Sequence, residues 1–274
     1  MRSRAQIRQQ VAFLLCLIPL LLGLSGPPRP GAARPVRIKV VADEEFRKKT
    51  SWILDVRRWT DSSSRYFLKN FGLELKIEDI EPWISDNAKG SIYGLMADLV
   101  KKKSRFGYDV VLGFTAQHFH GLESSGIASY LNGYVLVQKL KEDSLNTLIL
   151  IHEFCHLFGA IDLAEDYSIM ARSNPQVYCD EFTGRIVRIH KDRSFEPGVF
   201  ALAPDKIEAA ISLYQRRKAL NRQEVGTNIF LALFYVQIKD YDRAIKECLE
   251  ANKIDSGLPV VRSLLRTARE RKGS

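Results

Sequence analysis

The first part of the chain alternates between two hydrophobic periodicities. Apolar side chains recur at every second position in Val36–Ala42 and Leu73–Ile80, and Asp109–Phe114 is a short apolar run, so these segments predict strands. Between them, Phe46–Phe71 and Ile92–Lys103 carry apolar side chains at the spacing of a helix face. Strands that alternate with helices predict an α/β body. The apolar positions of the longer helix are Phe46, Ile53, Val56, Trp59 and Phe67.

The next segment predicts a turn between strands, followed by a helix. Gly126–Val137 has the composition of one or two strands around a turn at Asn132 and Gly133. Asp143 or Ser144 can cap the helix that follows, because their side chains accept hydrogen bonds from its first free N–H groups. The expected apolar face of this helix consists of Leu145, Leu148, Ile149 and Phe154.

The C-terminal part is predicted to be helical. A less regular stretch extends to about Pro204, and Asp205–Leu220 then predicts an amphipathic helix. Residues 225–256 are spaced like one tetratricopeptide-like hairpin, and Pro259–Arg271 predicts a further helix. A lone repeat buries little surface by itself, so we expect the hairpin to pack on the body, either completing its core or also binding a protein partner. The matching positions are Leu231, Ala232, Tyr235, Tyr241, Ala244 and Ala251.

The N-terminal segment resembles an export signal. Arginines precede the apolar run Val11–Leu24, and small and proline-rich residues follow it. The run is shorter than the roughly 20 residues of a membrane-spanning helix. Gly31–Ala33 and Gly23–Ser25 offer small residues for cleavage. We therefore expect residues 1–33 to be a signal peptide and linker, and the protein to be exported to the periplasm or secreted; it stays membrane-anchored if the segment is not cleaved.

Charge argues against one class of partner. The chain has 274 residues and a formal net charge of +9, but residues 1–33 contain basic side chains and no acid. A second basic group lies near the C-terminus. A nucleic-acid-binding protein would show a basic face interleaved with aromatics, or a known binding motif, and the sequence has neither. We therefore expect no nucleic-acid partner. The C-terminal basic residues are Arg262, Arg266, Arg269, Arg271 and Lys272.

A metal-binding motif lies in the helix predicted after residue 143. The segment HEFCH places His152 and His156 four positions apart, so both imidazoles lie on one helical face and can reach one ion. Zinc binds neutral imidazole well, and a catalytic zinc site keeps one position for water. Glu153 follows the first histidine and can take a proton from that water. The motif predicts one catalytic Zn²⁺ with these two histidine ligands and Glu153 as general base.

A glycine and an aspartate extend the motif. Gly159 lies three residues beyond His156 and can adopt the positive φ that ends a helix and reverses the chain. Such a reversal would bring Asp162 towards the metal from outside the helix. A carboxylate oxygen is an acceptable zinc ligand, so Asp162 is the candidate third ligand. The alternative is an ordinary helix end followed by a solvated loop acid.

The stretch HEFCHLFGAID resembles the extended motif of the metzincin clan of zinc peptidases. In that clan a methionine in a tight turn lies beneath the metal, and the resemblance makes Met170 the candidate. It also implies a twisted sheet with an active-site helix, an edge strand at Gly126–Val137 that pairs with extended substrate, and a final helix at Asp205–Tyr214. Asp as third ligand is similar to the snapalysin-like variant. Arg172 replaces the tyrosine that some members carry after the turn.

The remaining histidines and cysteines are predicted to have other roles. His118 and His120 are expected in a surface loop, and His190 is expected to face solvent among basic neighbours. Cys155 points away from the ligand face of the helix, so we expect it in the core rather than as a nucleophile. Three cysteines remain beyond the signal, which is too few for a disulfide framework, although a Cys155–Cys179 pair stays open. Cys248 is expected to be a free buried thiol.

These features predict an α/β (α+β) metzincin-like zinc peptidase domain at residues 36–222 and a tetratricopeptide-like hairpin at 223–272. The expected activity is zinc-dependent endopeptidase hydrolysis of a peptide or protein substrate, with Glu153 as general base. The alternative is an exported interaction module that keeps a metallopeptidase fold as a scaffold and binds partners through its C-terminal helices.

Overall fold

A computed structural model describes residues 33–119, 125–164, 167–171, 175–196 and 201–273. The predicted signal segment, His120 and Arg172 lie outside the described residues. In the part of the chain that the structure describes, no helix combines the length and the apolar character needed to cross a membrane.

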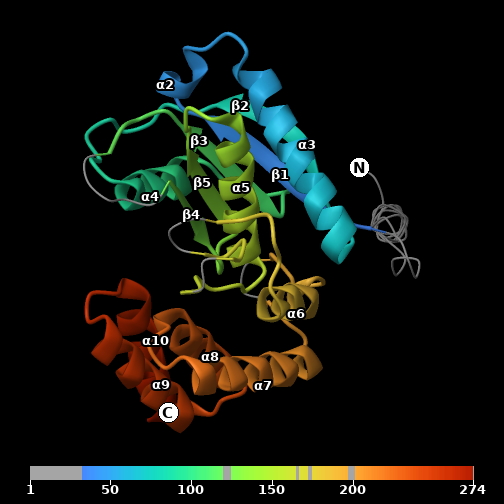
Figure 1. The fold of residues 1–274 in the computed structure, drawn as a ribbon. Coiled ribbons are helices and arrows are strands. Elements are labelled where there is room, and N and C mark those ends of the chain that lie inside the picture. The colour runs from blue at the N-terminus through green and yellow to red at the C-terminus, as the bar shows by residue number, and fades with distance from the viewer. Residues whose placement is uncertain (1–32, 120–124, 165–166, 172–174, 197–200, 274) are drawn as a thin grey trace, which may run out of the picture. The chain divides into compact units, whose positions relative to one another are not determined.

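A five-stranded sheet forms the centre of the fold. The strands are β1 (Arg34–Ala42), β2 (Leu73–Pro82), β3 (Val110–Thr115), β4 (Gly126–Ser129) and β5 (Tyr134–Gln138). Their order is β2-β1-β3-β5-β4, and all neighbours are parallel except β4, which pairs antiparallel with β5 along one edge (Figure 1). The segment at 126–137 is therefore a hairpin of two strands.

Helices cover both faces of this sheet. Helices α3 (Trp52–Phe71) and α5 (Asp143–Leu157) share the larger apolar core, and α4 (Ile92–Lys102) packs on the other face. Alternation along β1 explains the two cores, because Val40 joins the α3/α5 side and Val41 the α4 side. The α/β fold class predicted from the sequence is confirmed.

The helix predicted over Phe46–Phe71 is interrupted. A short helix α2 (Glu44–Arg47) is capped by the Asp43 side chain, and the chain turns before α3 begins. Ile53 was predicted to lie on the apolar face of this helix, and that prediction was wrong, because its side chain is 41% exposed. The other four apolar positions of that prediction are buried: Phe46, Val56, Trp59 and Phe67.

Two helices follow the irregular stretch that contains Met170. Helix α6 (Glu181–His190) was not predicted from the sequence, whereas α7 (Pro204–Leu220) was. The Asp180 side chain caps α6 by accepting from the Thr183 N–H at 2.8 Å. Gly184 and several β-branched residues in α6 have low helix propensity, which explains why the sequence pattern was weak there.

The C-terminal helices are α8 (Val225–Gln237), α9 (Tyr241–Ile254) and α10 (Pro259–Lys272). Helix α8 packs against α7 and α9, and α10 packs against α9 (Figure 1). Leu231 and Phe234 of α8 belong to the same apolar core as the sheet. The expectation that these helices pack on the body is therefore correct, while their likeness to a tetratricopeptide repeat and the boundary at residue 222 stay predictions.

Candidate metal centre

Helix α5 supplies two of the three candidate ligands. His152 and His156 lie one turn apart near its C-terminal end, and their Nε2 atoms are 3.1 Å from each other. The helix is held by apolar residues on its other sides, including Phe154 and Leu150, which are fully buried. A rigid buried helix therefore fixes both imidazoles on one face, as the sequence spacing predicted.

Backbone carbonyls orient both rings. The His152 Nδ1 atom lies 2.8 Å from the Ile169 carbonyl oxygen, and the His156 Nδ1 atom lies 2.9 Å from the Ala160 carbonyl oxygen. A carbonyl oxygen only accepts, so each Nδ1 must carry the proton in these contacts. In the neutral ring each Nε2 then offers a lone pair towards the other histidine, which is the tautomer that a metal needs.

The turn after α5 has the conformation expected of Gly159. Its φ is +84°, a value that residues with a side chain adopt at a cost. A Cβ on Gly159 would also lie 2.6 Å from the Cε1 atom of His190. Position 159 therefore requires glycine for two reasons: the positive φ of the backbone and the His190 ring packed against it.

This turn brings Asp162 to the two histidines. Its Oδ1 atom is 3.2 Å from the His152 Nε2 atom and 3.4 Å from the His156 Nε2 atom. Burial alone would raise the pKa of Asp162, but in the metal-free site the two imidazoles, when protonated, outweigh it by hydrogen bonds and charge and lower the pKa. One ligand atom from each of the three residues lies within 4.8 Å of the other two.

The three distances fit a zinc ion. Two ligand atoms at about 2.0–2.1 Å from a tetrahedral zinc lie about 3.3 Å apart, and the Nε2–Nε2 and Nε2–Oδ1 separations are 3.1, 3.2 and 3.4 Å. The donors are two imidazole nitrogens and one carboxylate oxygen, a set that zinc accepts. The residues present therefore fit the metal that the sequence predicted.

Glu153 lies against the edge strand. Its side chain is buried, and a Cβ on Gly126 of β4 would lie 2.6 Å from its Oε1 atom. The pKa of Glu153 is raised to about 7, mainly by burial. The charge at His152 opposes this rise, and the charge at Asp162 adds to it. A carboxyl group with this pKa can both accept and release a proton near neutral pH. Gly126 was not singled out in the sequence, although a glycine within a strand often marks such a close approach.

Met170 lies in a turn and directly follows Ile169, whose carbonyl contacts the first histidine. The Ala171 N–H donates to the Ser168 carbonyl at 3.0 Å, which closes the turn around Met170, and Met170 is fully buried. The preceding carbonyl, of Ile169, is the one that holds His152. The Ser168 hydroxyl donates to the Asp180 carboxylate, so the turn is tied to the start of α6.

Three residues that support the centre were missed or misassigned. His190 is fully buried, so the expectation that it faces solvent was wrong; apolar packing on α8 covers its ring, and burial lowers its pKa to about 3. The Tyr214 hydroxyl of α7 donates to the Gly159 carbonyl. Arg193 is also buried, donates to the Leu157 and Tyr130 carbonyls, and stacks its guanidinium on aromatic rings. Their partners come from distant segments, so no local pattern marks them.

The other predicted positions are as follows. Cys155 is fully buried in the core, and burial raises the pKa of its thiol. Cys155, Cys179 and Cys248 are free thiols. His118 is exposed, as expected for a surface loop.

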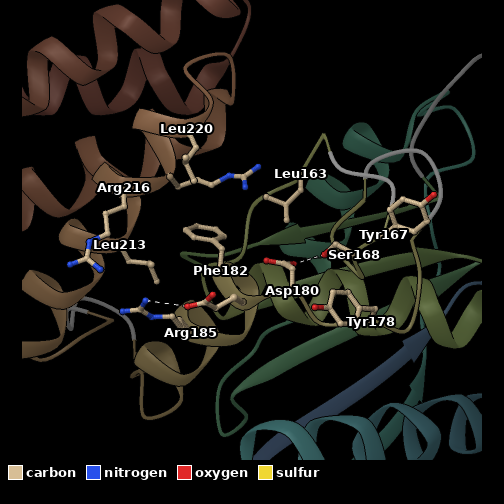
Figure 2. A pocket seen from close by; sticks show the side chains of 12 residues that line it. Leu163, Tyr167, Ser168, Tyr178, Asp180, Phe182, Arg185, Leu213, Arg216 and Leu220 are labelled. Atoms are coloured by element: carbon tan, nitrogen blue, oxygen red, sulfur yellow. Dashed lines mark hydrogen bonds and ion pairs between the residues drawn. The ribbon is translucent and has the colours of Figure 1, made fainter.

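A cavity of about 410 Å³ adjoins the loop that carries Asp162 and Met170. Leu163 and Ser168 of that loop form part of its lining, and Phe182 and Leu213 contribute apolar surface from α6 and α7 (Figure 2). The remaining lining residues are Tyr167, Tyr178, Asp180, Glu181, Arg185, Arg216, Arg217 and Leu220.

Comparisons with known proteins give limited information. No protein-family model and no curated protein match the sequence. Archaemetzincin from Methanopyrus kandleri superposes with a TM-score of 0.45 at 18% identity, over 59% of this chain and 96% of that one. A chaperone-substrate complex superposes with a TM-score of 0.47 at 9% identity, over 58% of this chain and 34% of that one. At such low scores neither likeness identifies a family.

Proposed function

We propose that this protein is a zinc-dependent endopeptidase of the metzincin type. The observation that carries the proposal is the convergence of His152, His156 and Asp162 at separations of 3.1–3.4 Å, with both Nδ1 atoms held by carbonyls. The arrangement supports a metal bound from one side, which leaves the opposite side for water and substrate.

Glu153 is the proposed general base. Bound zinc would supply a polarised water and a Lewis-acid contact to the scissile carbonyl. The Glu153 carboxylate would take a proton from the attacking water and give it to the departing amine. In the metal-free protein burial raises the pKa of Glu153, which makes its carboxylate a stronger base than an exposed one.

The edge of the sheet offers a place for the substrate backbone. Strand β4 is the last strand of the sheet in the described part of the chain, where it pairs with β5. An extended peptide can add to such an edge through main-chain hydrogen bonds. The Glu153 side chain packs on Gly126 of this strand, so the proposed base lies next to the proposed peptide site.

The decisive variant is Glu153→Gln, because glutamine keeps the shape of the side chain and cannot accept the proton. We expect Glu153→Gln protein to bind zinc as the wild type does and to cleave an unfolded casein-like protein about 100- to 10,000-fold more slowly. Cleavage at the wild-type rate would contradict the mechanism. A wild-type protein that binds zinc but cleaves no peptide would favour the interaction module instead.

We also propose that the protein is exported by its N-terminal segment. The support is the sequence alone, namely the apolar run Val11–Leu24 between basic and small residues. Mass spectrometry of the protein recovered from its native cells tests this. Cleavage after about residue 25 or 33 is expected, whereas an intact N-terminus in a cytosolic fraction would contradict export.

A further inference from the structure

The backbone between α5 and Met170 decides where the Asp162 carboxylate lies. Before Asp162, the Ala160 N–H donates to the Cys155 carbonyl at 3.0 Å. After it, the Leu163 N–H donates to the Met170 carbonyl at 2.8 Å. Ile161 lies between these fixed points, and its side chain is 3% exposed. Whatever contacts Ile161 therefore helps to set the position of the neighbouring carboxylate.

The start of α8 lies directly against Ile161. A Cβ on Gly226 would lie 2.9 Å from the Cγ2 atom of Ile161 and 3.1 Å from its Cβ atom. Real Cβ contacts of this kind are rarely so short, so the two residues are already in close contact. A glycine at this position lets the backbone of α8 approach the Asp162 loop.

Helix α8 is itself anchored to α7. A buried ion pair joins Arg217 of α7 to Glu224, the residue before α8, with Arg217 Nε donating to Glu224 Oε2 at 2.7 Å. The Tyr214 and Phe230 rings stack with centroids 5.2 Å apart and planes at 7°. Tyr214 also donates to the Gly159 carbonyl, so the residue that holds the turn before Asp162 is packed on α8.

The same helix contacts the other supports of the site. Phe230 packs on Tyr130, which follows the edge strand β4, with ring centroids 4.9 Å apart. Phe234 packs on His190, the ring that lies against Gly159, with centroids 5.9 Å apart. One face of α8 thus contacts the Asp162 loop, the residue that follows the edge strand and the His190 ring packed against Gly159.

We propose that the C-terminal helices form part of the metal centre, and that Gly226 and Ile161 are positioning residues for the third ligand. This inference rests on the proposed function, because it assigns a role in holding zinc. Helix α8 seats Ile161, Ile161 fixes the backbone at Asp162, and the carboxylate is thereby held 3.2 and 3.4 Å from the two Nε2 atoms. The inner face of α8 is used for this contact rather than for a protein partner.

The test is Gly226→Ala in the full chain. The added methyl would push on Ile161, so metal-free Gly226→Ala protein should bind Zn²⁺ about tenfold more weakly than wild type in competition with a chromogenic chelator. The visible spectrum of the Co²⁺-loaded protein should change as well, because it reports ligand geometry. Gly273→Ala is the matched control, since its new Cβ would lie 3.8 Å from the nearest atom. Gly273→Ala protein should bind both metals as the wild type does.

Two substitutions at Ile161 give the same test from the other side of the contact. Ile161→Val keeps the Cγ2 methyl that approaches Gly226, and its zinc affinity should stay within about twofold of wild type. Ile161→Ala removes that methyl, and its affinity should fall about tenfold. If Gly226→Ala protein does not fold, the difference in zinc affinity between the two Ile161 variants still tests the positioning role.

The outcomes separate this inference from the proposed function. A wild type that binds no zinc would contradict the proposed function. A wild type that binds zinc, together with Gly226→Ala and Ile161→Ala proteins of unchanged affinity and unchanged Co²⁺ spectrum, would overturn the inference alone. Weaker zinc binding by folded Gly226→Ala protein, with normal binding by the Gly273→Ala control, would support it.

Discussion

The two halves of the candidate metal centre are built in different ways. His152 and His156 belong to one buried helix, and their spacing alone brings their Nε2 atoms to 3.1 Å. Asp162 reaches the same point through a turn whose supports come from α6, α7 and α8. The first half is local in the sequence, and the second half depends on contacts between segments that are far apart.

This difference predicts how each half responds to change. A helix buried on several sides tolerates the loss of a distant contact, because its own hydrogen bonds fix the histidine spacing. A turn held by single contacts from several helices moves when one contact is lost. Substitutions away from the site should therefore affect zinc binding mainly through Asp162.

The largest effect is expected from removing a ligand in either half. His156→Ala should weaken zinc binding by more than about 100-fold, because α5 then offers one imidazole and the histidine pair on its face is lost. Asp162→Ala should cost less, about 10- to 100-fold, since the Asp162 side chain is 38% exposed and water can take its place. Chelator competition measures both. Equal losses would break the distinction between the two halves.

Gly159→Ala tests the turn itself. The residue has a φ of +84°, which costs an alanine about 1–2 kcal/mol. The new methyl would also meet the His190 ring at 2.6 Å, so the loss of unfolding free energy should exceed this amount. Urea denaturation of metal-free protein measures it. Gly257→Ala serves as a control in an exposed turn at negative φ, and a similar loss in both variants would show that the turn is not special.

The buried His190 ring should make the stability of the metal-free protein depend on pH. Burial lowers its pKa from 6.5 to about 3, so between these values the unfolded chain binds more protons than the folded one. The stabilising contribution is thus fully present above pH 6.5 and is lost as the pH falls towards 3. Urea denaturation at several pH values should show a steeper loss of stability for wild type than for His190→Phe protein. An equally steep loss of stability in His190→Phe protein would show that the buried ring is not the cause.

The smallest effect is expected at Tyr214. Tyr214→Phe removes one hydrogen bond to the Gly159 carbonyl and keeps the stack on Phe230, so the unfolding free energy should fall by about 1 kcal/mol. Zinc affinity should fall as well, and by more than the weaker folding would cause, because the turn before Asp162 loses the hydrogen bond that supports it. Tyr66→Phe is a suitable control, since it also removes a buried tyrosine hydroxyl. Unchanged zinc affinity in Tyr214→Phe protein would argue against support from α7.

The sequence predicted the parts of the site that depend on local spacing. The histidine pair follows from a four-residue interval, Gly159 from the need to end a helix, and the turn at Met170 from a family resemblance. The order of strands and helices before the site also followed from periodicity, apart from the interruption between α2 and α3.

The parts that escaped prediction depend on long-range packing. His190 lies among basic residues in the sequence, yet its ring faces Gly159 and Phe234 in the fold. Gly226 has no local pattern that links it to Ile161, because 65 positions separate the two along the chain. Helix α6 was missed because its propensity is low and its cap becomes evident only when Asp180 is seen to accept from Thr183.

Zinc-edge X-ray absorption of the zinc-loaded full chain tests the metal centre most directly. The account predicts one zinc with two imidazole nitrogens at about 2.0–2.1 Å and carboxylate and water oxygens at about 2.0–2.2 Å. In Asp162→Ala protein both imidazoles should remain and the carboxylate should be lost. A sulfur ligand at about 2.3 Å, a single imidazole, or no bound zinc in the wild type would contradict it.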